Sequence, residues 1–175
     1  MATKELISTV TVGAGGAASI DFTSIPQTFT DLHLVISTRC TNAAVTGPVF
    51  LSLNSSTTNR SERTLNGTGS GTGSYAITDN FVFDTVGNTA TSNIFNNASF
   101  YFPNYAGNAN KSFAFDQVNE NNTTASNQVL GAVLWSSTAA ITSISLTSPG
   151  YNWVQYSTAS LYGIRKGSDG ITTVA

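Results

Sequence analysis

The chain has 175 residues and a formal net charge of −2, and only 9% of its residues are Asp, Glu, Lys or Arg, against about 25% in an average soluble domain. Ser, Thr and Asn, which number 65 together, must therefore provide most of its polar surface. This composition argues against an enzyme, because general acids, general bases and metal ligands come mainly from the scarce residue types. No run of Lys or Arg could neutralise phosphates, so nucleic-acid binding is not expected.

All predicted elements are strands, and no window of ten residues has helical periodicity. In the first half of the chain, β-branched or alternating apolar segments predict strands at 6–12, 18–22, 32–36 and 49–53, with a weak strand at 63–65. In the second half, strands are predicted at 75–78, 94–102, 112–118, 129–135, 141–146 and 157–165. Segment 49–53 has apolar residues on both faces and is expected to be central in its sheet.

Nine or ten short strands with little or no helix predict an all-β fold, a single antiparallel β-sandwich of jelly-roll type. We assign residues 1–165 to this domain and residues 166–175 to a C-terminal tail or arm. The glycine-rich segment 67–74 is expected to be a flexible loop within the domain. The N-terminus has no export signal and the chain has no apolar stretch near 18 residues, so we expect no membrane span.

Three features that could indicate a functional site have simpler structural explanations. Residues 13–18 fit a dinucleotide-binding glycine pattern, but a strand follows them instead of the required helix, so we expect a hairpin loop. His33, the only histidine, lies in an alternating segment and is expected to be a surface strand residue. Cys40, the only cysteine, is expected to be a small buried residue at a strand end.

No catalytic residue, cofactor or metal is assigned. Loop oxygens from Asp79, Asn80 and Asp84 leave calcium binding open as an alternative.

Candidate interface residues come from aromatics near turns and from the two ends of the chain. We predict that half of these aromatics are core residues and that the rest, at loop ends, form a subunit interface or a sugar-stacking platform. Terminal segments can pair with the sheet edge of a neighbouring subunit. The candidates are Leu6, Val10, Tyr105, Tyr151, Trp153, Ile171 and Val174.

Four segments carry a resemblance to a known group of proteins. They are IPQTFTDL at 25–32, FPNY at 102–105, WSSTAAITSI at 135–144 and STASLYGI at 157–164. In these segments the chain resembles the small β-sandwich virion proteins of tailed bacteriophages, which serve as capsid decoration (cement) proteins or as tail and fibre appendages.

The resemblance implies a structural protein without catalytic residues, assembled in the host cytoplasm and displayed on the capsid exterior of the virion. Its expected partners are further copies of itself, in a homotrimer, and the major capsid protein or another virion protein. The alternative is a tail-fibre or receptor-binding domain that recognises cell-surface glycan through aromatics such as Tyr105 and Trp153. A glycan-cleaving enzyme is a third and weaker interpretation, because the carboxylates are sparse and unpaired.

Overall fold

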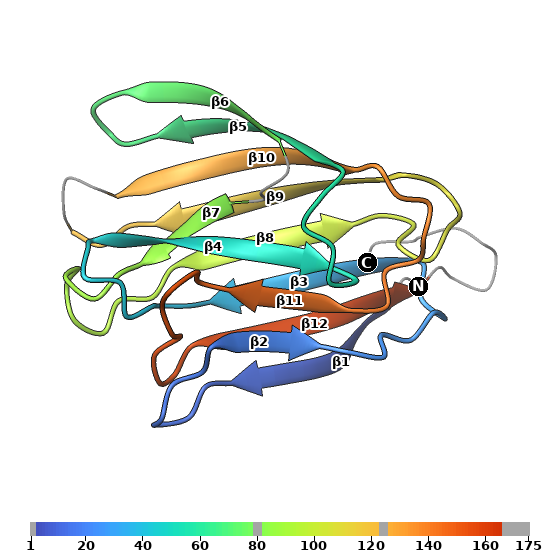
Figure 1. The fold of residues 1–175 in the computed structure, drawn as a ribbon, viewed down its shortest axis with the longest axis horizontal. Coiled ribbons are helices and arrows are strands. Elements are labelled where there is room, and N and C mark those ends of the chain that lie inside the picture. The colour runs from blue at the N-terminus through green and yellow to red at the C-terminus, as the bar shows by residue number, and fades with distance from the viewer. Residues whose placement is uncertain (1–2, 79–81, 123–125, 166–175) are drawn as a thin grey trace.

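The structure, a computed structural model, describes residues 3–78, 82–122 and 126–165, which form two antiparallel β-sheets packed face to face (Figure 1). The larger sheet contains, in spatial order, β1 (Thr3–Thr11), β12 (Thr158–Arg165), β3 (Asp31–Ser37), β8 (Asn97–Phe102), β9 (Lys111–Asn119), β10 (Asn127–Trp135), β5 (Arg60–Gly67) and β6 (Thr72–Thr78). The smaller sheet contains β2 (Ser19–Phe22), β11 (Ile144–Thr147), β4 (Thr46–Leu53) and β7 (Val82–Val86). The predicted β-sandwich is confirmed, and these residues include no helix long and apolar enough to cross a membrane.

The strand pairing is that of a jelly roll with two insertions. Four pairs, β1–β12, β2–β11, β3–β8 and β4–β7, nest inside one another as in a hairpin ribbon rolled around a core. They give two four-stranded layers, β1-β12-β3-β8 and β2-β11-β4-β7. The remaining strands are two hairpins, β5–β6 inserted between β4 and β7, and β9–β10 inserted between β8 and β11.

The two inserted hairpins join through the pairing of β10 with β5. Together, β9, β10, β5 and β6 widen the larger sheet from four strands to eight, and we call them the extension. The smaller sheet ends at β7, which contacts β9, so β10, β5 and β6 reach beyond it (Figure 1). The extension therefore has less cover on its inner face than the rest of the larger sheet.

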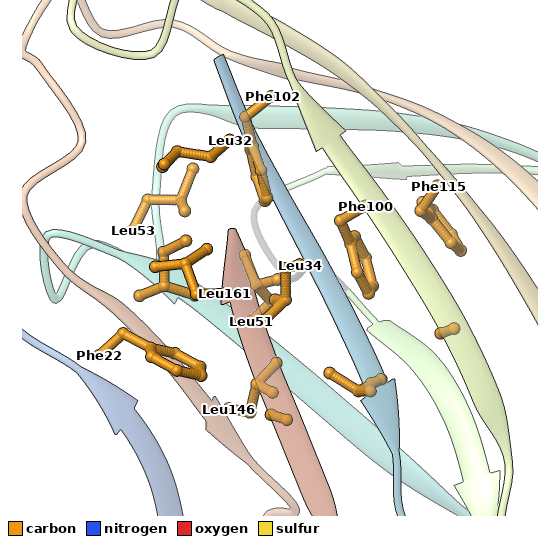
Figure 2. Close-up of a cluster of buried hydrophobic side chains, with 14 of the residues drawn as sticks. Phe22, Leu32, Leu34, Leu51, Leu53, Phe100, Phe102, Phe115, Leu146 and Leu161 are labelled. Atoms are coloured by element: carbon orange, nitrogen blue, oxygen red, sulfur yellow. The ribbon is translucent and has the colours of Figure 1, made fainter. Parts of the chain in front are cut away.

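The core lies between the two sheets and follows the two-residue period of the strands. Figure 2 shows Leu51 and Leu146, from the smaller sheet, beside Leu34, Phe100 and Leu161 of the larger sheet. All five side chains are buried, and full burial of each stabilises the fold by about 1.5–3 kcal/mol. Segment 49–53, expected to be a central strand, belongs to β4, which pairs with β11 on one side and β7 on the other.

Packed phenylalanines connect the extension to the jelly roll. The ring of Phe100 on β8 stacks on Phe115 of β9 with 5.3 Å between centroids, and Phe83 of β7 lies 5.1 Å from Phe100. The Phe115 ring also crosses Gly131 of β10, where a Cβ atom would lie 1.7 Å from the ring. Gly131 is therefore required for close packing at the first strands of the extension.

Buried cations in this carboxylate-poor chain are bound by main-chain carbonyls. Arg39 is 7% exposed, and its guanidinium donates to the carbonyl oxygens of Thr91, Ala90, Ile94 and Asn88 at 2.7, 3.0, 3.1 and 3.2 Å. The Lys111 ammonium group donates likewise to the carbonyl oxygens of two residues in the preceding loop. A salt bridge is found at the surface, in the exposed pair Arg165–Glu5 at 3.1 Å.

The glycine-rich segment 67–74 is a tight hairpin, which corrects the expected flexible loop. β5 continues to Gly67 and β6 begins at Thr72, while the amide of Thr68 donates to the carbonyl oxygen of Gly71 at 3.0 Å. Gly69 has a φ angle of +80°, a conformation that glycine adopts without strain and that suits the first position of a two-residue hairpin turn. The glycines therefore serve a sharp turn between two long strands.

The structure also tests the expectations for residues 13–18 and for Cys40. Residues 13–18 form a loop, as expected, but not a hairpin, because the flanking strands β1 and β2 belong to different sheets. Cys40 is fully buried just after β3, as expected. The strand β7 had no counterpart among the predicted strands, because its five residues include Asp84 and Thr85 between the apolar ones.

Candidate interaction surface

The outer face of the larger sheet points away from the core, and the described elements place no further layer over it (Figure 1). The pairing register places one row of side chains across all eight strands of this face. The row consists of Leu6, Tyr162, His33, Tyr101, Ala114, Ala132, Arg63 and Ala76. Apart from Arg63 and His33, the row is apolar or aromatic.

An apolar groove lies on this face over the extension. Leu65 of β5 and Leu130 of β10 stand opposite each other and are 62% and 52% exposed. They line a groove of about 620 Å³, which we call the extension groove, together with Ala76, Ala114, Ala132 and the flanking Arg63. Large apolar side chains gathered in one exposed patch are typical of a contact surface for another molecule.

Burial keeps His33 and Tyr101, in the middle of the outer face, uncharged near neutral pH. His33 lies 2.7 Å from the Ser99 hydroxyl through Nε2, and its pKa is lowered by burial and by the nearby Lys4, against an opposing effect of Asp116. The hydroxyl of Tyr101 donates to Asp31 at 2.7 Å. Burial, and then this bond, raise the pKa of Tyr101 to about 12. The histidine is therefore neutral and the phenol protonated at pH 7.

A polar network joins β7 to the extension on the inner side. The Asp84 carboxylate accepts a hydrogen bond from Asn127 at 3.4 Å, and Gln117 donates to Oδ1 of Asn127 at 3.3 Å. Burial raises the pKa of Asp84, although the bond from Asn127 acts in the opposite direction. Asp84 and Asn127 line a crevice of about 200 Å³ with Asn66 and Tyr75, a residue that is 57% exposed. This crevice combines an aromatic ring with polar side chains.

Two of the candidate interface residues are core residues instead. Tyr105 and Trp153 are fully buried, so their prediction as surface contacts is wrong and the core interpretation is confirmed. The Tyr105 hydroxyl donates to the carbonyl oxygen of Pro26, and the Trp153 indole donates to that of Leu146 at 3.2 Å. Both aromatics satisfy their polar atom inside the sandwich, which is why they can be buried completely.

The other candidates are scattered. Leu6 is exposed on β1 at one edge of the outer face, whereas Val10 is partly buried and packs against the core. Tyr151 is 37% exposed in the turn that follows β11 of the smaller sheet. Ile171 and Val174 lie outside the described residues. The structure therefore does not gather these candidates into one site.

The extension groove was missed by the sequence analysis. The continuous apolar run 129–135 predicts a strand that is apolar on both faces, which is usually a sign of burial on both sides. Here Val133 and Trp135 point into the core, and Leu130 and Leu134 point outward into an uncovered face. The run itself was the available signal, but the missing outer layer could only be seen in the structure.

The calcium alternative stays untested, because Asp79 and Asn80 lie outside the described residues. Within the described ranges, no three His, Cys, Asp or Glu side chains are grouped so that they could hold a metal ion.

Comparison of this chain with known proteins finds no matching family model, no matching curated protein and no matching solved structure.

Proposed function

We propose that this chain is a virion structural protein, a capsid decoration (cement) protein that acts as a homo-oligomer and stabilises the shell by bridging neighbouring capsid subunits. The observation that carries the proposal is the extension groove on an outer sheet face with few charges. Jelly rolls occur in viral capsid domains and also in lectins, so the fold alone does not select a function. The resemblance to phage virion proteins gives the proposal its direction.

The physical mechanism is mass action. A protein that binds only the assembled shell lowers the free energy of that state relative to free subunits. Leu65 and Leu130 would be covered at the contact, and each contributes up to about 1.5–3 kcal/mol when fully buried. A shell presents many copies of the contact, so that a modest affinity at each contact is sufficient for cooperative stabilisation.

The test compares virus particles assembled with the wild-type chain, without it, and with the double variant Leu65→Asp/Leu130→Asp. Both side chains are exposed in the isolated chain, so the variant should fold, with a thermal melt lowered slightly because the two carboxylates face each other across the strands. We expect it to be absent from particles, and those particles to release their genome at the same lower temperature as particles without the chain. Tyr156→Asn is the matched control, because Tyr156 is an exposed aromatic outside the extension at a positive φ that Asn tolerates. Wild-type occupancy of the double variant would contradict the proposal.

Glycan recognition is a second candidate, favoured by the crevice between β7 and the extension. The aromatics first considered for it, Tyr105 and Trp153, are buried, but Tyr75 offers an exposed ring beside Asp84 and Asn127. A ring flanked by planar hydrogen-bonding groups suits the apolar face and hydroxyls of a sugar. A glycan array is the direct test. Binding that is lost in Tyr75→Ala would support this candidate, and an array without hits would exclude the glycans tested.

A further inference from the structure

The four edge strands of the two sheets are protected very unequally. β1 carries Lys4 and Glu5 and has a bulge between Leu6 and Ser8, and β2 is only four residues long and contains Asp21. Charges, bulges and short length are the usual means by which proteins prevent an edge from pairing with another chain. At the third edge, β7, side chains from neighbouring elements hydrogen-bond both main-chain groups of Asp84. The side chain of Gln117 accepts from the amide of Asp84, and the side chain of Asn96 donates to the carbonyl oxygen of Asp84.

The fourth edge, β6, has none of these protections. Its seven residues, Thr-Gly-Ser-Tyr-Ala-Ile-Thr, include no charged residue and no proline, and its pairing with β5 is continuous, without a bulge. β6 forms the upper rim of the molecule in Figure 1, and within the described ranges its strand neighbour is β5 alone. A long, uncharged and regular free edge is a template for pairing with another strand.

The hairpin register identifies the main-chain groups at this edge. The amide of Thr68 bonds to the carbonyl of Gly71 beside the turn, and hydrogen-bonded and non-hydrogen-bonded pairs alternate from there along the ladder. Tyr75 thus forms a hydrogen-bonded pair with Thr64, whereas Ser74 and Ala76 belong to non-hydrogen-bonded pairs. In an edge strand, the residues of non-hydrogen-bonded pairs direct their N–H and C=O groups outward. The free groups therefore belong to Ser74 and Ala76, and by the same alternation to Thr72 and Thr78.

We infer that two copies of this chain join through antiparallel pairing of β6 with β6, about a twofold axis at Tyr75. In this register Ser74 pairs with Ala76 of the second copy, and Thr72 pairs with Thr78, so that outward groups meet outward groups along the whole strand. The two Tyr75 residues face each other in a non-hydrogen-bonded pair, the closer kind of cross-strand contact, which favours aromatic pairs. The result is one continuous sheet across two molecules.

A second copy is the partner that fits this edge without further assumptions. The strand is complementary to itself because its outward groups are symmetric about Tyr75 and no like charges meet. Isologous pairing satisfies each outward N–H and C=O of both strands at once, and it places the exposed Tyr75 rings against each other. The inference does not depend on the proposed function, because it would hold equally for a dimer with no role on a capsid.

The first experiment is the mass of the full chain in solution, by light scattering after size exclusion, over a concentration series. We expect twice 18.3 kDa. The variant Ala76→Pro removes an outward N–H while leaving the ladder to β5 intact, and an edge strand tolerates proline at such a position. We expect it to keep the far-UV circular dichroism of the wild type and to raise the dimer dissociation constant about tenfold or more, as loss of one or two hydrogen bonds at an interface predicts.

The second experiment tests the register through residue 75. Tyr75→Lys and Tyr75→Glu should each be monomeric, because like charges would face each other across the twofold axis. An equimolar mixture of the two variants should form a heterodimer, because opposite charges then meet. Tyr156→Lys, a matched substitution at an exposed tyrosine outside β6, should leave the wild-type dimer intact.

Several outcomes would overturn the inference. They are a wild-type monomer throughout the series, an Ala76→Pro dimer with the wild-type dissociation constant, or a mixture of charge variants that stays monomeric. A trimer would also overturn it, since pairing with one second copy uses up the edge. The dimer and the proposed function can fail independently. The dimer is tested by the mass of the protein in solution, and the proposed function is tested by the occupancy of the protein on virus particles.

Discussion

The amide nitrogen of Asp84 lies 3.1 Å from Oε1 of Gln117, and this contact closes the free edge of the smaller sheet. Gln117 belongs to β9 of the larger sheet and is fully buried. The contact therefore also ties the two layers together where the smaller sheet ends and the extension begins. A buried side-chain amide here replaces the charged residues that protect sheet edges in most proteins.

Replacing Gln117 by Ala should destabilise the fold by about 1–3 kcal/mol, because it leaves the partly buried amide of Asp84 without this acceptor. Urea denaturation followed by circular dichroism measures the change. Gln128→Ala, on the exposed outer face of β10, is the control and should change the free energy of unfolding by less than about 0.5 kcal/mol. Equal stability of the two variants would show that Gln117 does not protect this edge.

The pKa of Asp84 gives the stability a defined dependence on pH. Burial raises its folded pKa above the ordinary value of 3.8, so the native state binds more protons than the unfolded state between the two values. The free energy of unfolding contributed by this group therefore falls as pH rises from 3.8 through the raised folded pKa, and it is constant above that. Asp84→Asn removes the titration.

The measurement is the difference in free energy of unfolding between wild type and Asp84→Asn, from urea titrations at a series of pH values. We expect the difference to shift in favour of the variant as pH rises through this window. A difference that does not vary with pH would show that Asp84 titrates normally in the folded protein.

Gly131→Ala should destabilise the protein, because the added methyl would lie 1.7 Å from the Phe115 ring. Overpacking of this kind costs about 1–3 kcal/mol. Ala132→Ser, one position along β10 and on the exposed outer face, is the control. Thermal melts of both variants compare the two faces of the same strand, and a stable Gly131→Ala would mean that β10 moves away from β9 without cost.

Trp153→Ala should cost about 3–5 kcal/mol, the usual effect of removing a buried large aromatic side chain. Tyr151→Ala, two residues earlier and partly exposed, should cost far less. Equilibrium unfolding of the two variants separates a core residue from a surface residue in the same turn. Similar losses would mean that Tyr151 also stabilises the core.

Arg39→Lys should destabilise the segment between β7 and β8, because an ammonium group cannot match the fork that donates to four carbonyls. Loss of one or two hydrogen bonds to a charged donor costs about 1.5–3 kcal/mol each. Limited proteolysis should show faster cleavage within residues 88–94 than in the wild type. Unchanged cleavage would show that this segment is held by other contacts.

Local patterns in the sequence were sufficient to predict the class of the fold. Alternation such as Leu32, Leu34 and Ile36 records which side of a strand faces the core, and that period does not depend on which strands become neighbours. The same patterns could not locate the 67–74 hairpin, because glycine alternating with Ser and Thr is common to flexible loops and to edge strands. The pairing of Gly67 with Thr72 and the bond from Thr68 to Gly71 distinguish the two.

The extension groove, in contrast, could be located almost entirely from the tertiary structure alone. The sequence by itself determined that the chain is a β-sandwich poor in charge, because composition and two-residue periodicity are properties of short segments. Only the tertiary structure decided that Trp153 is buried and Leu130 exposed, and that β6 lies at the edge of the larger sheet. Exposure of an apolar side chain depends on whether another layer covers it, and an edge depends on the order of strands distant in the sequence.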